Sequence, residues 1–267
     1  MALTNKTIAS SYGDILQVDN NGSGRTANGT NIKDGLGNST SLTLGSNKAH
    51  IKPSSNQTDA FLVENAAGTD LLKVDTTNTS VLAGTTQSYV NTKVQRFCIY
   101  SFDLPDGFHV SMMVDVGSSG LGATGATSDS GTSFGTGTDP ATSLTLADNE
   151  QTSMQLLNSI FYVPVAITID EVRVLATGDG GNIDFHVMSY DMAGGTGSDA
   201  GDLSNGTLLA HSGSVIAVDG DRIVTDTLTT TEEASNIPAD KIIIATVEQI
   251  GTSTDVSAQL LIKYHYQ

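Results

Sequence analysis

The chain has 267 residues, of which 38% are hydrophobic, with 28 glycines, no tryptophan and a formal net charge of −17. This length suits one large domain or two ordinary ones, and short runs of Thr, Ser, Asn, Gly and Val favour strands and tight turns over helices. The acidic balance argues against a protein that binds nucleic acid or an anionic membrane through its charged surface. We therefore expect an all-β protein.

The N-terminal segment shows no targeting signal. Its first ten residues, MALTNKTIAS, lack the apolar core of a signal peptide, and no apolar run reaches membrane-spanning length. Cys98 is the only cysteine, so no disulfide can form within the chain, and we expect a buried thiol. These features predict a protein made in the cytoplasm, without membrane insertion.

Residues 1–84 are predicted to form an array of short strands separated by Gly, Asn and Thr turns. The segment GDILQVDNN (13–21) aligns with TDLLKVDTT (69–77), and the runs STSLTLG and KAHIKP lie between them. Such hairpins have no thickness for a core of their own, because an isolated two-stranded ribbon is marginal in water. We expect other copies of the chain, or a particle surface, to cover their apolar side chains. The residues expected in this interface are Leu16, Val18, Leu71, Leu72, Val74 and Val81.

Residues 85–96 are predicted to connect this module to the rest of the chain. Tyr89, Val90, Val94 and Phe97 recur at roughly helical spacing. Two interpretations are open: a short helix over 87–96 that meets its symmetry mates at an axis, or a plain surface turn.

Residues 97–267 are predicted to form a jelly-roll-like β-sandwich, with a long Gly/Ser/Thr-rich loop over 117–140. In NIDFHV (182–187), apolar residues alternate with Asp184 and His186, as in a half-buried antiparallel strand. The charge is uneven: residues 1–96 carry 8 Lys/Arg and 7 Asp/Glu, whereas 97–267 carry 4 and 22, a net of −18. This asymmetry indicates two regions with different surroundings.

Two sequence motifs suggest catalysis but lack the required context. GTSFG (131–135) matches the nucleophile elbow, which needs a strand before Ser133 and a helix after it. GLGATG (120–125) matches a dinucleotide-binding turn, yet no helix is predicted after it. The histidines are predicted to be ordinary strand or loop side chains, although His109 and His186 lie near carboxylates. They stand at positions 50, 109, 186, 211 and 265.

Three acidic clusters, in 179–184, 199–202 and 219–222, are weak candidates for a calcium site. Paired loop carboxylates can bind Ca²⁺ through oxygen ligands, but Asp-Gly is also common hairpin-turn chemistry. We expect no cofactor, with Ca²⁺ as the alternative. The candidate ligands are Asp179, Asp184, Asp199, Asp202, Asp219 and Asp221.

The segments TNKTIASSYGDILQVDNNGSG (4–24) and AFLVENAAGTDLLKVDTTNTSVLAG (60–84) resemble the N-terminal module of tailed-bacteriophage virion appendages, the fibre-like proteins. The shared signature is an apolar strand, a Gly turn, L-x-V-D-T-x-N and a closing V-x-x-G. The resemblance covers about the first third of the chain. It implies a homotrimer whose N-terminal part docks on the particle and whose C-terminal β-domain points outward. The chain has no collagen-like or coiled-coil shaft, so a short appendage is expected.

Three functions follow as hypotheses. The first is a non-enzymatic structural protein of the virion: a trimeric head fibre, capsid decoration or short tail fibre that contacts phage capsid or tail proteins. The second is a receptor- or carbohydrate-binding fibre tip that contacts a host surface glycan. The third is a polysaccharide depolymerase, which the absence of a catalytic constellation and of tryptophan disfavours.

Overall fold

The computed structural model describes residues 16–18, 27, 29–84, 86, 88–104, 106–114, 133–146, 156–251 and 254–267. Strands dominate this part of the chain, which confirms the expectation of an all-β protein. The chain divides into two compact units, Met1–Val90 and Asn91–Gln267. In the described ranges, no helix has the length and apolarity to cross a membrane.

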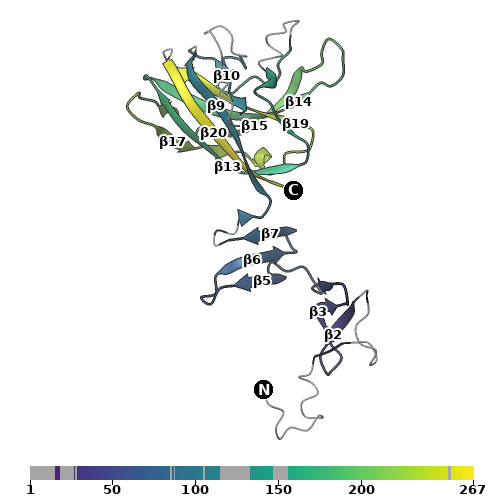
Figure 1. Cartoon of the computed structure of the whole chain (residues 1–267). Coiled ribbons are helices and arrows are strands. Elements are labelled where there is room, and N and C mark those ends of the chain that lie inside the picture. The colour runs from purple at the N-terminus through teal and green to yellow at the C-terminus, as the bar shows by residue number, and fades with distance from the viewer. Residues whose placement is uncertain are drawn as a thin grey trace. The chain divides into compact units, whose positions relative to one another are not determined.

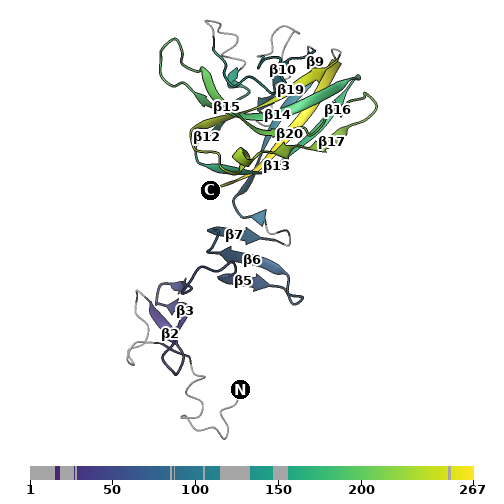
Figure 2. The same cartoon turned by 180° about the vertical axis from the view of Figure 1, so that it is seen from behind.

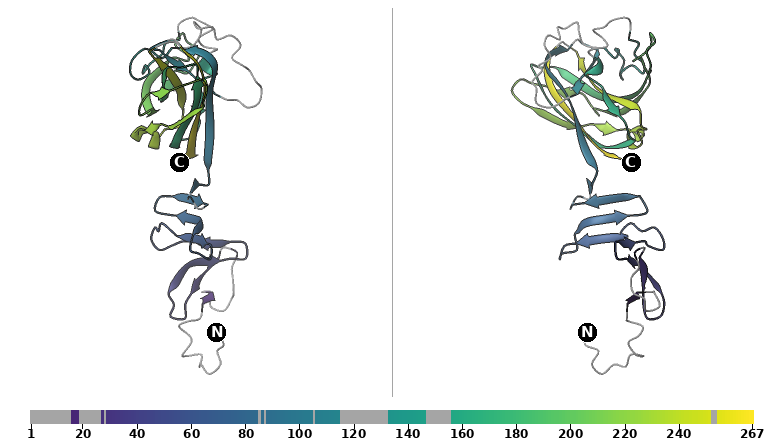
Figure 3. Two further views of the ribbon diagram at one scale, coloured as in Figure 1. Left: turned by 90° about the vertical axis from the view of Figure 1, so that its left-hand side faces the viewer. Right: turned by 45° about the vertical axis from the view of Figure 1, so that its right-hand side comes forward.

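The N-terminal unit contains two four-stranded antiparallel sheets, in each of which the strands follow one another in chain order (Figure 1). The first sheet consists of β1 (Gln17–Val18), β2 (Thr30–Lys33), β3 (Ser39–Leu44) and β4 (Ala49–Ile51). The second consists of β5 (Phe61–Glu64), β6 (Asp70–Asp75), β7 (Ser80–Ala83) and β8 (Ser88–Tyr89). In Figure 3, β5, β6 and β7 lie as one layer of strands.

Side-chain carboxylates close the turns of this unit. The Asp75 Oδ1 atom accepts hydrogen bonds from the backbone N–H groups of Thr77 and Asn78, both at 2.9 Å. These bonds, with one from the Asn78 amide, favour the ionised carboxylate and lower the pKa of Asp75 below its ordinary value. Asn38 does the same for Asp34 between β2 and β3. Hydrogen bonds from the backbone to short polar side chains therefore stabilise these turns.

The C-terminal unit is a sandwich of two antiparallel sheets (Figures 1 and 2). One sheet has the order β11 (Met113–Val114), β9 (Thr92–Leu104), β20 (Thr254–Tyr266), β13 (Ile167–Gly178) and β17 (Val224–Thr227). The other has the order β10 (His109–Ser111), β19 (Lys241–Ile250), β14 (Asn182–Met192), β15 (Leu203–His211) and β18 (Thr229–Thr230). β12 (Phe161–Val163) also pairs with β19, β16 (Ile216–Ala217) pairs with β14, and a 3₁₀ helix, η2, spans Glu232–Ser235.

Eight of these strands have jelly-roll connectivity. In chain order they are β9, β10, β13, β14, β15, β17, β19 and β20. The first and last of them, β9 and β20, lie side by side, with β13 and β17 next in the same sheet. The second strand, β10, pairs with the seventh, β19, which is followed by β14 and β15. This order is that of two interlocked Greek keys, so the predicted jelly-roll-like sandwich is confirmed.

The main core fills the space between the two sheets. Alternate residues of each strand point into it, as a side-chain period of two requires. From β14 and β19 these are Ile183, Phe185, Val187, Ile243, Ala245 and Val247, all fully buried. The alternation predicted for 182–187 is confirmed, but His186 on the outer side of β14 is buried as well.

A bulge in β13 keeps its apolar residues on the core side. The register against β20 shifts between Ile169 and Glu171. The next buried residue after Ile169 is therefore Val172, three positions on instead of two, and the extra residue, Asp170, is exposed. Its carboxylate accepts a hydrogen bond of 2.8 Å from the His265 Nδ1 atom on β20. The bulge thus preserves the apolar alternation and fixes an ion-pairing position at the same time.

Residues 85–96 differ from the expected connector or short helix. In the described part of this range, β8 ends at Tyr89 and β9 begins at Thr92. Thr92 pairs with His265 and Val94 with Lys263 on β20. The apolar spacing that suggested a helix belongs to a strand end, because pairing with β20 supplies the backbone partners. The C-terminal unit accordingly begins near Asn91 rather than Phe97.

The Gly/Ser/Thr-rich stretch over 117–140 was predicted to be a long loop. Residues 117–132 lie outside the described ranges, but 133–140 pack on the outer face of the sheet that contains β14 and β19. Phe134 is fully buried there, in a second apolar cluster with Met188, Tyr190 and Ile244. One aromatic side chain is thus enough to fix a segment of otherwise loop-like composition.

Truncation tests the corrected boundary. A chain that begins at Phe97 loses the five pairs from Thr92–His265 to Arg96–Leu261. We expect it to melt roughly 5 °C below a chain that begins at Asn91, since about 2 kcal/mol of strand pairing is lost. Circular dichroism melting curves measure the difference. Equal melting temperatures would contradict the boundary at Asn91.

Candidate functional site

Two neighbouring rows on one face of the β5–β7 sheet are apolar. Directly paired residues of antiparallel strands lie on the same face, and every second residue along a strand shares it. The register therefore gives two neighbouring rows across the three strands. They are Phe61, Val74 and Val81 in one row and Val63, Leu72 and Ala83 in the next. All six side chains retain solvent exposure, which is 38–40% for Phe61, Val63 and Val81.

The opposite face of this sheet is amphipathic. Its central row runs from Leu62 through Lys73 and Leu82 to Tyr89. The Lys73 Nζ atom lies 3.8 Å from the Asp70 carboxylate, so this face carries charged groups that favour water. The face that carries the two apolar rows is therefore the candidate interface.

The structure brings together only part of the interface predicted from sequence. Leu72, Val74 and Val81 lie in the two apolar rows, whereas Leu71 lies at a register shift in β6, 42% exposed and outside them. Leu16 is exposed beside β1, and Val18 belongs to β1, in the other sheet of the unit. Sequence reasoning missed Phe61, Val63 and Ala83. The alternation within AFLVE (60–64) is the signal that could have found the first two.

The six candidate calcium ligands are distributed over three connections and a strand. Asp179 follows β13, Asp199 and Asp202 lie between β14 and β15, Asp219 and Asp221 lie between β16 and β17, and Asp184 is in β14. Several accept backbone hydrogen bonds: Asp202 Oδ1 from Leu146 N–H at 2.7 Å, and Asp179 Oδ1 from Asp255 N–H at 3.0 Å. Within the described ranges, no group of three His, Cys, Asp or Glu is placed to bind a metal ion.

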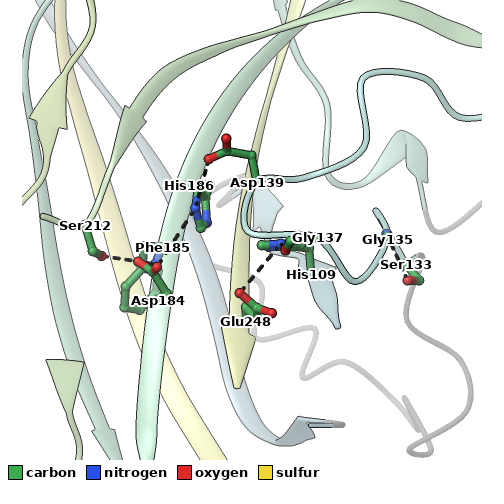
Figure 4. A network of polar contacts seen from close by, with 10 residues as sticks. All are labelled: His109, Ser133, Gly135, Gly137, Asp139, Asp184, Phe185, His186, Ser212 and Glu248. Atoms are coloured by element: carbon green, nitrogen blue, oxygen red, sulfur yellow. Dashed lines mark hydrogen bonds and ion pairs between the residues drawn. The ribbon is translucent and has the colours of Figure 1, made fainter. Parts of the chain in front are cut away.

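A cluster of polar side chains lies on the outer face of the sandwich, where residues 133–140 cover β10, β19 and β14 (Figure 4). The register places two rows side by side. The first row is His109, Glu248 and Asp184, and the second is Ser111, Thr246, His186 and His211. The rings of His109 and His186 meet edge to face with centroids 4.9 Å apart, and both are almost completely buried.

The contacts of the two imidazole rings show which of their nitrogen atoms have hydrogen-bond partners. His109 Nε2 lies 2.6 Å from the Gly137 carbonyl oxygen, which can only accept, so Nε2 carries a proton. Among the described residues, neither His109 Nδ1 nor His186 Nδ1 has a hydrogen-bond partner. His186 Nε2 lies 3.7 Å from Asp139 and 4.0 Å from Asp184, too far for hydrogen bonds.

Burial sets the electrostatics of this network. It disfavours the charged imidazolium and lowers the pKa of His186 to about 4, against the opposing pull of Asp184 and Asp139. Burial also raises the pKa of Glu248, whose carboxylate lies 3.6 Å from His109 Nε2. At neutral pH the network therefore contains an uncharged His186 ring packed under a polypeptide cover.

The sequence motif around Ser133 does not form a nucleophile elbow. Ser133 makes an isolated β-bridge with Val110, and its hydroxyl accepts a hydrogen bond from Gly135 N–H at 3.3 Å. The segment continues through bends at 136–139 instead of entering a helix. The other motif, at 120–125, lies outside the described residues.

No protein-family model and no curated protein matches this chain. Among solved structures, it is similar to one titled "Structure of infectious bursal disease virus Gx strain", at 11% identity and a TM-score of 0.21, over 72% of this chain and 63% of that one. A second, of the Gt strain of the same virus, has 10% identity and a TM-score of 0.13, over 65% of each chain. The chain thus matches just under two thirds of either relative. Both TM-scores are low, so function has to be argued from the residues of this chain.

Substitution of Thr246 tests how much an unpartnered polar group in these buried rows costs in the free energy of unfolding. Its hydroxyl is buried between Ser111 and His186 and has no hydrogen-bond partner in the structure. Thr246→Val keeps the shape and removes the desolvated hydroxyl, so we expect the free energy of unfolding to rise by about 1 kcal/mol. Denaturant titration measures it. Thr231→Val is the control: its hydroxyl donates to the Leu208 carbonyl at 2.7 Å, and its loss should destabilise. Equal destabilisation by both changes would contradict the assignment.

Proposed function

We propose that this chain is a non-enzymatic structural protein of a tailed-phage virion. It forms a homotrimer, a short appendage or capsid decoration, that attaches to the particle through its N-terminal unit and displays the jelly-roll sandwich. The observation that carries the proposal is the pair of partly exposed apolar rows on β5–β7, a sheet of very short strands.

The apolar face needs a cover that the sheet itself does not provide. Six apolar side chains on one side of a single layer favour association, because apolar area removed from water is the main driving force for burial. The apolar rows of three copies can converge around a threefold axis, where each chain buries its rows against its neighbours. Copies of the same chain are therefore its natural first partners, in line with the trimer that the family resemblance implies.

The charge distribution supports the same arrangement. Residues 1–96 are close to neutral, so copies can converge there without electrostatic repulsion. Residues 97–267 carry a net charge of −18, which keeps the displayed sandwiches soluble and apart from one another and from nucleic acid. We infer from this that attachment and display belong to different ends of the chain.

The polar groups of the sandwich favour a structural role over a catalytic one. Asp179 and Asp202 accept backbone hydrogen bonds in turns, and the buried His186 ring is neutral under the segment that covers it. A general base needs access to a substrate proton, which a fully covered ring does not have. Display in the virion, without a cofactor, is the function that these assignments support.

Oligomeric state tests the assembly surface. Light scattering on the purified protein should give three times the chain mass of 27.6 kDa. Val81→Glu places a carboxylate in the apolar rows and should yield monomers, because burying an unpaired charge costs several kcal/mol. Leu82→Glu is the matched control. Leu82 follows Val81 in β7, faces the other side of the sheet and pairs with Lys73, so this change should leave the mass unchanged.

The outcomes separate two claims. A monomer for the unchanged protein at micromolar concentration would overturn the homotrimer. A trimer that survives Val81→Glu would leave the homotrimer standing and remove the β5–β7 face from its interface.

Particle attachment is the second test. The full chain should bind phage particles that lack it, whereas a chain that begins at Asn91 should not, because it retains only the acidic sandwich. Co-sedimentation with the particles measures both. Equal binding by the two chains would reverse the assignment of attachment and display, and the number of copies bound per particle would separate a decoration from a fibre.

A further inference from the structure

Residues 133–146, here called the strap, cross the outer face of the sheet that contains β14 and β19. At one end, Phe134 N–H donates to the His109 carbonyl at 2.8 Å, and His109 N–H donates to the Gly135 carbonyl at 3.0 Å. At the other end, Leu144 and Leu203 exchange two backbone hydrogen bonds of 2.8 and 3.0 Å. Apolar side chains fasten both ends, because Phe134 and Leu144 pack in the second apolar cluster.

The centre of the strap is attached differently. Thr136, Gly137, Thr138 and Asp139 are solvent-exposed, and the contacts described for them run to the two histidines beneath. Gly137 accepts from His109 Nε2, and the Asp139 carboxylate faces His186 Nε2 at 3.7 Å (Figure 4). The strap therefore has apolar ends and a polar centre that rests on two buried imidazoles.

We propose that His109 and His186 form an acid-released latch, which keeps the centre of the strap, residues 136–139, on the sheet at neutral pH and lets it lift when the pH falls. The closed arrangement needs an uncharged His186 ring, because a proton added at its buried Nδ1 atom finds no acceptor among the described residues. His109 holds the strap through its hydrogen bond to the Gly137 carbonyl. Lifting the strap gives the His186 ring access to water, where the added proton is solvated.

Charged groups on every neighbouring element act on the latch. Burial is the largest effect on His186 and disfavours its charged form; His109 on β10 and His211 on β15 act in the same direction, and together they outweigh Asp184 on β14 and Asp139 on the strap. Glu248 on β19 faces His109, with Asp184 and Asp106 nearby. Because burial raises the pKa of Glu248, its proton favours the closed form as the pH falls and partly opposes the effect of His186.

The sign and size of the response follow from proton linkage. The pKa of His186 is about 4 in the closed form and, once solvated, returns toward the ordinary 6.5. The lifted form then binds more protons between these values, so the ratio of lifted to closed molecules rises as the pH falls from 6.5 to 4. From His186 alone, the rise at pH ~5 is at most about 30-fold.

Hydrogen exchange of the full chain, measured by mass spectrometry at about pH 7.5 and pH 5, tests the latch. After correction for intrinsic exchange rates, amides of 133–146 should lose protection at the lower pH, while those of β19 should not. Glu248→Gln removes the opposing group and should enlarge the loss. His186→Gln should abolish most of it, and His109→Gln, which lacks the bond to Gly137, should raise strap exchange already at the higher pH.

His50→Gln, an exposed histidine in the N-terminal unit, is the matched control and should behave as the unchanged protein. Circular dichroism confirms that each variant is folded before exchange is measured. An acid response that is the same in His186→Gln and in the unchanged protein would overturn the latch. So would a response shared equally by the strap and β19, because it would report unfolding of the whole sandwich.

Discussion

A β-sheet has two faces, and each apolar face must be covered; most features of this protein follow from how that requirement is met. In the sandwich, the inner faces of the two sheets cover each other. The outer face of β14 and β19 is also apolar toward one end, and the strap covers it with Phe134. In the N-terminal unit, the apolar rows of β5–β7 stay partly exposed among the described residues, and this difference is what makes them an interface in our proposal.

The two covers differ in their chemistry. Between the sheets, the contacts are almost all apolar and insensitive to pH. Beneath the strap, apolar contacts from Met188 and Tyr190 give way along the same strand to His186 and Asp184. In the proposed latch, the centre of this cover stays in place only while the buried His186 ring is uncharged. The acidic surface of this unit adds a field that favours protonation, so the sandwich combines a fixed core with one titratable layer.

In our proposal, charge and burial together divide the chain into two roles. In the near-neutral N-terminal unit, the carboxylates of Asp34 and Asp75 stabilise turns. The apolar rows of β5–β7 remain accessible to another chain. The sandwich buries its apolar residues internally and presents carboxylates to solvent. An appendage that is attached at one end and displayed at the other needs this division, whether it decorates a capsid or forms a short fibre.

Local pattern was enough to predict the all-β class and the jelly-roll-like sandwich, because strand alternation and turn residues are properties of neighbouring positions. The sequence also indicated that residues 1–84 lack a core. It could not show which residues share a face: Leu71 and Leu72 are equivalent in composition, and only the register with β5 and β7 separates them. The helical spacing over 87–96 was misleading, because the partner strand β20 lies at the far end of the chain. For the same reason the pairing of His109 with His186 required the tertiary structure, since strands distant in sequence bring the two rings together.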